Sequence, residues 1–511
     1  MWSRIAAFLL VCLAASLSGF PDRAEAQYRT TASAYSEGAF RKLGLERAWQ
    51  TQVEFDVTRG KLAGVSQHIS SKSAQTIVEV TYPGGRKVFS ERDLDAFNRP
   101  LGAKGARAEA EIWIENWKLR TGSKAEPEIS EQVVPDVVLV ATSQRGTVQC
   151  INAETGRTLW SNKVGSTRHP TTSAGINETH VAVINGSTLY MLDRADGHVL
   201  WERTTSHPAG NGPALSDELV FIPMVDGHMD LFHIKEPRRP VASFQSHGRC
   251  LVQPVVFRDA VAWPTDRGSL YIGNAEVAGI RFRINAKDKI DSSQTAIHSA
   301  PTFRAGIGEL PPLVYFATSD GYVYSAETLK GAIVNRFSAG ESISSTPVVI
   351  GDQVYVVTNS GTLFCIGADD AQERWFTTGI KSFLAANFKR LYCLDRDNRL
   401  VGFDAETGSP LGAIGLGEID YSFLNTQSDR IYVGTSSGAL QCLREMRQYY
   451  PFVHGGMEPK KQFAEVNQPS QDSEEEAMEK PEATTEEDPF DADKPEKPAV
   501  PAAEDEDPFG K

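Results

Sequence analysis

Short apolar runs and polar turns alternate over most of the chain. The recurring unit is an apolar run rich in β-branched and aromatic residues, a polar turn that usually ends in glycine, and a second apolar run. In one copy, residues 137–142 are followed by the turn Ser-Gln-Arg-Gly146 and then by Thr-Val-Gln-Cys-Ile. Strands of this composition joined by Gly, Asn or Asp turns form β-hairpins. The pattern therefore predicts an all-β chain of repeated hairpins.

The hairpin turns recur at a nearly constant spacing. They fall at positions 146, 187, 227, 268, 321, 361, 398 and 438, and include Gly146, Gly321, Gly361 and Gly438. All intervals but one are close to 40 residues. A period of about 40 residues is typical of a propeller blade of four short strands. We therefore expect a β-propeller over residues 41–448.

A second phrase follows several of these hairpins. Two copies read Asn152-Ala-Glu-Thr-Gly156-Arg-Thr-Leu-Trp160 and Asp193-Arg-Ala-Asp-Gly197-His-Val-Leu-Trp201. A third copy contains Gly408, and a looser one ends in Trp375. The Asn or Asp side chain opens a turn, the glycine takes a positive φ, and the tryptophan is expected to pack against the neighbouring blade. These positions are interpreted as structural.

This phrase resembles the tryptophan-docking repeat of the PQQ-like propeller family, which contains quinoproteins and BamB-like proteins. The resemblance implies eight blades. Seven or nine remain open, because a ninth hairpin surrounds Gly84-Gly85 and is separated from the regular series by an irregular insertion at residues 106–135. An isolated strand around Trp49 is expected to pair with the hairpin at Gly438 and close the ring, since closure leaves no free sheet edge.

The two ends of the chain have different compositions from the middle. Residues 1–26 contain Arg4, an apolar stretch at 5–17 and the sequence Ala24-Glu25-Ala26, which together are typical of a cleavable signal peptide. The apolar stretch is too short to span a bilayer. Residues 449–511 are expected to be a linker and a disordered, acidic, Pro-rich tail. We therefore expect a periplasmic or secreted protein without a transmembrane segment.

The negative charge lies almost entirely in that tail. The whole chain has 66 acidic and 52 basic residues, a net charge of −14. Residues 458–511 hold 18 acidic and 6 basic residues, a net of −12, which leaves −2 for the rest. A nearly neutral body has no basic face for a phosphate backbone, so nucleic acid is not an expected partner.

The tail repeats one short acidic and aromatic phrase. It occurs as Glu487-Asp488-Pro489-Phe490 and Glu506-Asp507-Pro508-Phe509. Asp488, Pro489, Phe490, Asp507, Pro508 and Phe509 are therefore candidate docking residues for another protein. A solubilising tail with two chance copies is the alternative.

Few residues point to catalysis or to a cofactor. The resemblance implies that a quinoprotein enzyme would hold PQQ with calcium between a tryptophan and a disulfide of adjacent cysteines, but the chain has no Cys-Cys pair. Trp263 is a candidate for an inner strand. Three cysteines, Cys150, Cys365 and Cys442, stand four residues after a turn glycine, and such a repeated position favours buried thiols. We expect no catalytic residue and no cofactor.

Four histidines suggest one sharper hypothesis. Each precedes an expected inner strand, so they could line one mouth of the propeller: His169, His207, His247 and His298. Neutral imidazoles bind metals and titrate near neutrality. Ordinary loop histidines are the alternative, and we expect no bound metal.

Taken together, these features favour a non-catalytic exported propeller that acts as a protein-binding or assembly platform in the cell envelope. It would be monomeric or part of a hetero-complex, with envelope or extracellular proteins as partners. The alternatives are a PQQ-dependent dehydrogenase or other small-ligand quinoprotein, and a surface protein that binds carbohydrate or another polymer.

Overall fold

The computed structural model describes residues 37–454, except 56–59, 84, 94, 96–98, 287–294, 307–310 and 418. The chain divides into two compact units, residues 1–459 and 460–511, and every described residue belongs to the first. The expected signal peptide and the two candidate docking motifs of the tail lie outside the described residues.

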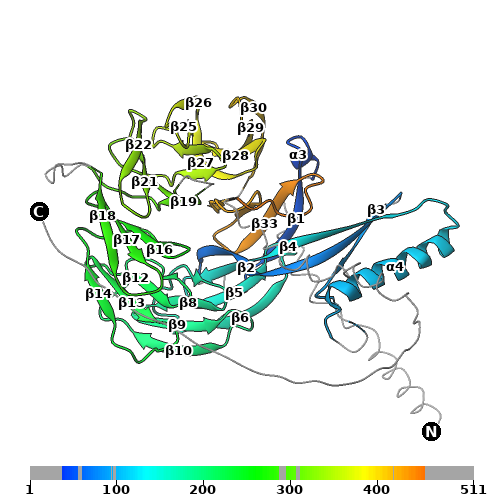
Figure 1. The fold of residues 1–511 in the computed structure, drawn as a ribbon, viewed down its shortest axis with the longest axis horizontal. Coiled ribbons are helices and arrows are strands. Elements are labelled where there is room, and N and C mark those ends of the chain that lie inside the picture. The colour runs from blue at the N-terminus through cyan, green and yellow to red at the C-terminus, as the bar shows by residue number, and fades with distance from the viewer. Residues whose placement is uncertain are drawn as a thin grey trace, which may run out of the picture. The chain divides into compact units, whose positions relative to one another are not determined.

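Eight antiparallel sheets follow one another along the described chain, which confirms the expected eight-bladed, all-β propeller (Figure 1). The first blade contains β2 (Leu62–Tyr82), β3 (Gly85–Ser90), β4 (Glu128–Ser143), β5 (Thr147–Asn152) and β6 (Thr158–Lys163). The second contains β7 (Gly175–Ile176), β8 (His180–Asn185), β9 (Thr188–Asp193) and β10 (Val199–Thr204). The third contains β11 (Ala214–Leu215), β12 (Leu219–Pro223), β13 (His228–His233) and β14 (Ala242–Gln245).

The remaining five blades repeat this order. The fourth contains β15 (Val255–Phe257), β16 (Ala260–Pro264), β17 (Ser269–Asn274) and β18 (Ile280–Asn285). The fifth contains β19 (Thr302–Arg304), β20 (Leu313–Ala317), β21 (Tyr322–Glu327) and β22 (Ile333–Ser338). The sixth contains β23 (Val348–Ile350), β24 (Gln353–Val357), β25 (Thr362–Gly367) and β26 (Glu373–Thr378). The seventh contains β27 (Ile380–Ala386), β28 (Arg390–Asp395), β29 (Arg399–Asp404) and β30 (Pro410–Gly415). The eighth contains β31 (Tyr421–Ser422), β32 (Ile431–Gly434), β33 (Ala439–Glu445) and β1 (Leu45–Gln52), which follows the short helix α3 (Glu37–Arg41).

The hydrophobic core lies between neighbouring blades. One cluster joins Val140 and Cys150 of the first blade to Val181 and Val183 of the second. The middle strands are buried on both faces, so they read as continuous apolar runs rather than as strict alternation. The turn glycines Gly146, Gly321, Gly361 and Gly438 lie between the second and third regular strands of their blades, as expected.

The N-terminal strand completes the last blade. In β1, Trp49 stands opposite Cys442 of β33, as we expected from the sequence. Arg444 of β33 also donates to the Glu46 carboxylate at 2.8 Å. The ring is therefore closed by residues nearly 400 positions apart.

Tryptophans of the outer strands dock on the next blade. Trp160 Nε1 donates to the Arg194 carbonyl at 2.7 Å. Gly197, with a φ of +76°, lies so close that a Cβ there would stand 2.2 Å from the Trp160 ring. Trp375 docks in the same way on the turn that contains Gly408. Only glycine fits under the indole at these turns.

The ninth hairpin is not a ninth blade. Strands β2 and β3 form it, and β2 is a single 21-residue strand that begins in the first blade and continues beyond it. The insertion expected to be irregular contains most of the 20-residue helix α4 (Gly102–Thr121) and the first half of β4. The sequence of α4 is rich in Ala, Glu, Lys and Arg, which are good helix formers. This element adds to the first blade and leaves the count at eight.

Candidate interaction site

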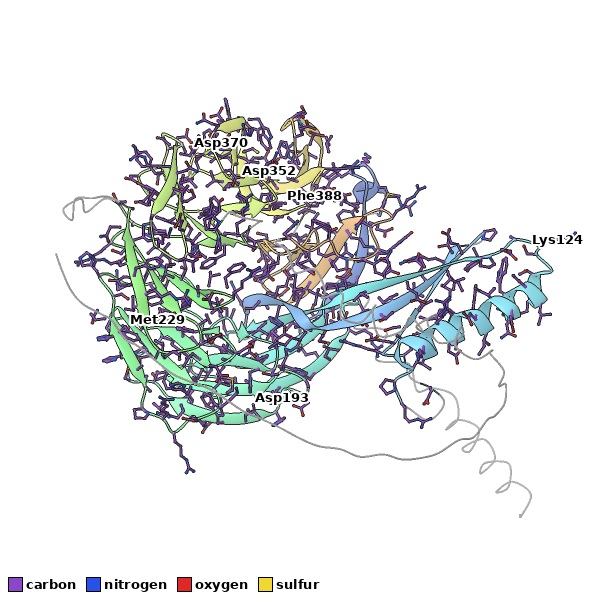
Figure 2. The ribbon with its side chains drawn as sticks, in the orientation of Figure 1. Lys124, Asp193, Met229, Asp352, Asp370 and Phe388 are labelled. Carbon is purple, nitrogen blue, oxygen red and sulfur yellow. The ribbon has the colours of Figure 1, made fainter. Side chains whose placement is uncertain are left out.

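The first blade carries a long extension that we call the arm: residues 74–82 of β2, β3, residues 128–135 of β4, and α4. Within the blade, β2 pairs with residues 137–143 of β4, and after an irregularity at residues 69–74 it continues to pair with β4 while β3 joins its other edge. The arm extends beyond the blades in Figure 1. Lys124, in the connection from α4 to β4, lies at its far end (Figure 2).

Helix α4 covers one face of the arm sheet. Its buried side chains are Ala106, Ala110 and Ile114, which pack against Val78 and Val80 of β2. The small alanines at i and i+4 let the helix approach the sheet closely. Toward the far end, Tyr82 contacts the rings of two tryptophans of α4, Trp113 and Trp117, with centroids at 5.0 and 5.5 Å. The arm therefore has a small hydrophobic core of its own.

The opposite face meets the segment that follows the last strand, residues 446–454, which we call the C-terminal strap. The Tyr450 hydroxyl donates to the Glu79 carboxylate of β2 at 2.6 Å. Arg86 of β3 also pairs with Glu79 at 3.1 Å, and its guanidinium lies 3.2 Å from the centre of the Tyr449 ring. Burial and the hydrogen bond to Glu79 raise the pKa of Tyr450, so its hydroxyl remains protonated. The strap thus ties the arm to the last blade.

A buried arginine fixes the strap. Arg430 is fully buried, and its guanidinium pairs with Glu154 of the first blade at 3.0 Å and with Asp429 at 3.3 Å. It also donates to the carbonyls of Gln448 and Tyr449, at 3.3 and 2.9 Å. Burial raises the pKa of Asp429 to about 6, although the adjacent guanidinium opposes this. A buried charge with this many partners costs several kcal/mol to unpair, so it holds the strap in one position.

A second polar network holds the base of the arm against the second blade. Ser70 of β2 donates to the Glu178 carboxylate at 2.6 Å, and Arg194 donates to the Glu178 carbonyl at 2.6 Å. Asp136 of β4 accepts from Arg92 at 3.1 Å and lies 3.7 Å from Arg194. Arg194, Glu178 and Asp136 keep only 11–13% of their side-chain surface exposed. The arm is therefore held at its base as well as on both faces.

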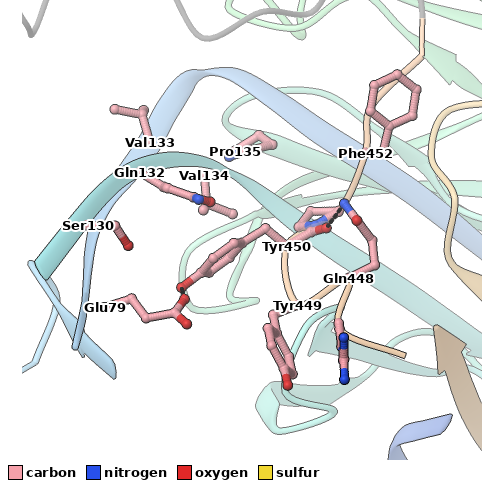
Figure 3. A pocket seen from close by; sticks show the side chains of 12 residues that line it. Glu79, Ser130, Gln132, Val133, Val134, Pro135, Gln448, Tyr449, Tyr450 and Phe452 are labelled. Atoms are coloured by element: carbon pink, nitrogen blue, oxygen red, sulfur yellow. Dashed lines mark hydrogen bonds between the residues drawn. The ribbon is translucent and has the colours of Figure 1, made fainter. Parts of the chain in front are cut away.

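An open cleft of about 490 Å³ lies between the arm and the strap (Figure 3). Its lining residues are Glu79, Ser130, Gln132, Val133, Val134, Pro135, Arg447, Gln448, Tyr449, Tyr450, Pro451 and Phe452. One wall is a β-strand and the other is rich in aromatic side chains. The volume is within the range of small-ligand and peptide sites. The cleft is therefore large enough to bind a small ligand or a peptide. Its lining residues do not form a nucleophile paired with a general base.

The four candidate rim histidines are exposed and do not come together. In the described residues, no contact joins any two of His169, His207, His247 and His298, and no group of three or more His, Cys, Asp or Glu side chains is arranged to hold a metal ion. His207 instead stacks on His228, with centroids 6.2 Å apart, and both rings lie within 3.4 Å of the Asp226 carboxylate. Burial tends to raise the pKa of Asp226. Hydrogen bonds from His228 and the nearby His207 outweigh this and hold the pKa of Asp226 below its ordinary value.

The residues do not fit the PQQ cradle that the resemblance implies. Trp263 lies in β16, the second strand of its blade, where it is 1% exposed and stacked on Tyr271 at 5.5 Å. Its Nε1 donates to the Ser246 hydroxyl at 3.0 Å. The indole is thus part of the core between blades and offers no open face to a cofactor. The five described cysteines are free and buried, as expected for three of them from their repeated position.

The sequence did not identify the residues that form the cleft. Residues from 449 onward were expected to be a linker, but Tyr449, Tyr450 and Phe452 pack against the body of the protein. The run Tyr449-Tyr450-Pro451-Phe452 directly after the last strand was the available signal, since aromatic side chains are uncommon in free linkers. Arg430 gave no clear signal, because of its two carboxylate partners only Asp429 is adjacent and Glu154 is 276 positions away.

The comparisons agree with this architecture. A family model described as "Outer membrane protein assembly factor BamB" (PQQ_2) matches residues 101–209, 144–240 and 319–444, which together cover just over half of the chain. The outer membrane protein assembly factor BamB of Bordetella pertussis is 25% identical over 262 residues, 47% of this chain and 64% of the relative. That of Burkholderia pseudomallei is 28% identical over 116 residues, 23% of this chain and 30% of the relative. The chain thus spans less than two thirds of these relatives' length.

Two solved structures are also similar. BamB from Moraxella catarrhalis has a TM-score of 0.49 at 13% identity, covering 61% of this chain and 92% of that one. The computationally designed Ika8 protein has a TM-score of 0.47 at 14% identity, covering 60% of this chain and 92% of that one.

Proposed function

Because the chain belongs to the BamB family of PQQ-like β-propellers, we propose that it is a non-catalytic, exported propeller that serves as a protein-binding or assembly platform in the cell envelope. Its matched relatives are named as outer membrane protein assembly factors, which supports envelope proteins as partners. Neither helix of the described residues is long and apolar enough to cross a membrane. A periplasmic or secreted location, after removal of residues 1–26, is part of the proposal.

The observation that carries the proposal is the arm. It is built into the first blade by one continuous strand, and α4, the strap and the charged network at its base hold it in place. Extended elements on a rigid scaffold suit recognition, because little ordering entropy is lost when a partner binds. Lys124 is exposed at the far end of the arm, where another protein can reach it (Figure 2).

Site-specific photocrosslinking in intact cells of the source organism tests the platform. A photoreactive amino acid at Lys124 is expected to capture a defined set of envelope proteins, and the same group at Asp370, in a blade turn away from the arm (Figure 2), is expected to capture fewer or different ones. Repeating the experiment without residues 458–511 shows whether the acidic tail recruits any of them. Equal and nonspecific capture at both positions would contradict the platform.

Cofactor addition separates this function from the dehydrogenase alternative. Because Trp263 is covered on its face by Tyr271, adding PQQ with calcium is expected to give no bound chromophore and no rise in melting temperature. A saturable thermal shift would favour the quinoprotein instead, since a ligand that binds only the folded state stabilises it in proportion to its concentration above Kd.

A further inference from the structure

The cleft lies along an unpaired edge of a β-sheet. Residues 128–135 of β4 pair with β2 on one side. β5 pairs with β4 only from Val138 onward, and in the described part of the chain no backbone hydrogen bond joins the outer side of residues 128–135 to another segment. Such an edge presents a row of N–H and C=O groups that can accept an added strand.

The two edges of the arm sheet differ in how they are protected. The outer edge, β3, carries Arg86 and Lys87 in only six residues, and short, basic edges discourage strand addition. The β4 edge instead borders the cleft with Ser130, Gln132 and Val133, and its Glu131 pairs with Arg107 of α4 on the other face of the sheet. Glu128 begins the strand and is not among the residues that line the cleft. The β4 edge is therefore available for strand addition, whereas the β3 edge is protected against it.

The charges of the cleft specify the chemistry of an occupant. The Glu79 carboxylate is neutralised by Arg86 at 3.1 Å and accepts a hydrogen bond from the Tyr450 hydroxyl at 2.6 Å. Arg447 also lines the cleft, is exposed, and has no carboxylate within ion-pair distance among the described residues. Its φ of +70° is rare for a residue other than glycine. The cleft therefore has one uncompensated positive charge next to an aromatic wall.

From this geometry we infer that the cleft between the arm and the strap binds an extended peptide segment of a partner protein, which adds to the β4 edge as a strand. Backbone groups of the peptide pair with residues 128–134, one apolar or aromatic side chain packs among Tyr449, Tyr450 and Phe452, and one acidic side chain pairs with Arg447. The proline at position 135 ends the edge, since it cannot donate to a ladder. The inference rests on the proposed function and names the class of ligand and the place where it binds.

Selection of peptides on the purified full chain tests the inference. A displayed library of random heptapeptides is expected to yield binders that contain an acidic residue, lack proline, and lose binding when synthesised with alternate backbone N-methyl groups, because N-methylation removes the donors of the ladder. Arg447→Glu is expected to weaken these peptides about tenfold or more, since it replaces attraction by repulsion. Arg238→Glu, which changes an exposed arginine of a loop in the third blade, is the matched control and should leave binding unchanged.

The possible results separate the hypotheses. No enriched peptide, or binders that are indifferent to both N-methylation and Arg447→Glu, would overturn strand addition at this cleft. Peptides that bind only a chain ending at residue 457 would assign the cleft to the chain's own tail and overturn a partner as the occupant. If no peptide binds the cleft while crosslinking at Lys124 still captures envelope proteins, the platform stands and this inference falls. If peptides bind the cleft but no envelope protein is captured, the cleft binds peptides and the platform falls.

Discussion

Trp49 closes the ring, and replacing it by alanine tests how much closure depends on one docked indole. Its side chain is 7% exposed, and its Nε1 donates to the Ala153 carbonyl of the first blade at 2.7 Å. Gly156 lies under the ring, where a Cβ would come within 2.6 Å of it. Trp49→Ala therefore removes this hydrogen bond and the packing of the indole on the first blade.

The expected loss follows from this burial. A tryptophan that buries about 200 Å² at about 25 cal/mol per Å² contributes about 5 kcal/mol. Alanine keeps a small part of that area, and the neighbours relax only partly, so we expect a loss of about 3–5 kcal/mol. Trp49→Phe keeps most of the area and leaves the Ala153 carbonyl without its donor, which is expected to cost about 1–3 kcal/mol.

Urea unfolding combined with amide hydrogen exchange measures both quantities. Trp160→Ala is the matched control, since Trp160 is 8% exposed and its Nε1 also donates at 2.7 Å to a carbonyl of the next blade. Both alanine variants should lose similar stability, but only Trp49→Ala should speed exchange in β1 and β33. Wild-type protection of β1 and β33 in Trp49→Ala would refute the assignment of this indole as the closing contact.

Three further predictions concern other parts of the ring. Gly408→Ala places a Cβ 2.5 Å from the Trp375 ring at a φ of +70°, whereas the control Gly340→Ala, at +69°, meets no atom within 4 Å. Thermal unfolding should show Gly408→Ala to be less stable than Gly340→Ala by about 1–3 kcal/mol. Equal losses in the two variants would contradict the docking role of Gly408. Burial lowers the pKa of His454 to about 4. Its neutral imidazole therefore contributes fully to the free energy of unfolding above pH 6.5. As the pH falls toward 4 the unfolded state takes up a proton first, and the free energy of unfolding drops by about 2–3 kcal/mol at pH 4.5. His454→Gln should remove that loss when urea midpoints at pH 7.5 and 4.5 are compared with wild type, and an unchanged difference would contradict it. The five buried thiols should react with a thiol reagent only after denaturant is added, and fast labelling of the native protein would show that one of them is accessible.

The fold was predictable because its information is local and repeated. The hairpin turn recurs in every blade and the glycine-tryptophan phrase in several, so one copy such as that ending in Trp160 indicates the same structure wherever it recurs. The pairing of β1 with β33 was also predictable, although its partners are far apart, because a ring needs closure. Local signals and one topological requirement were sufficient for the propeller and its closure, whereas the count of eight was implied by the resemblance.

The arm and its cleft could not be predicted in the same way. The polar run at residues 70–75 looks like a loop, yet β2 continues through it, with Ser70 bonded to Glu178 of the second blade and Lys72 paired with Asp217 of the third. Helix α4 buries two alanines and one isoleucine, which gives a weak apolar stripe. Arg430 pairs with the adjacent Asp429, but its other carboxylate partner, Glu154, is 276 positions away, so no short window of the chain contains the full set of partners. The candidate site is an insertion that occurs once, and repeats cannot reveal it.

The closure of the ring by β1 also sets the order in which the protein can fold. Gln52 and Ser437, which are hydrogen-bonded in the closed ring, are 385 positions apart, whereas the strands of a blade are joined within about 40 residues. Bringing such distant ends together costs about 2 kcal/mol more in chain entropy than closing one blade, and contacts of this range slow folding. We therefore expect blades one to seven to form early and the eighth to form last, once both ends of the propeller are available. Until then, β33 has an open edge, and a chain interrupted before residue 431 leaves β1 without a partner.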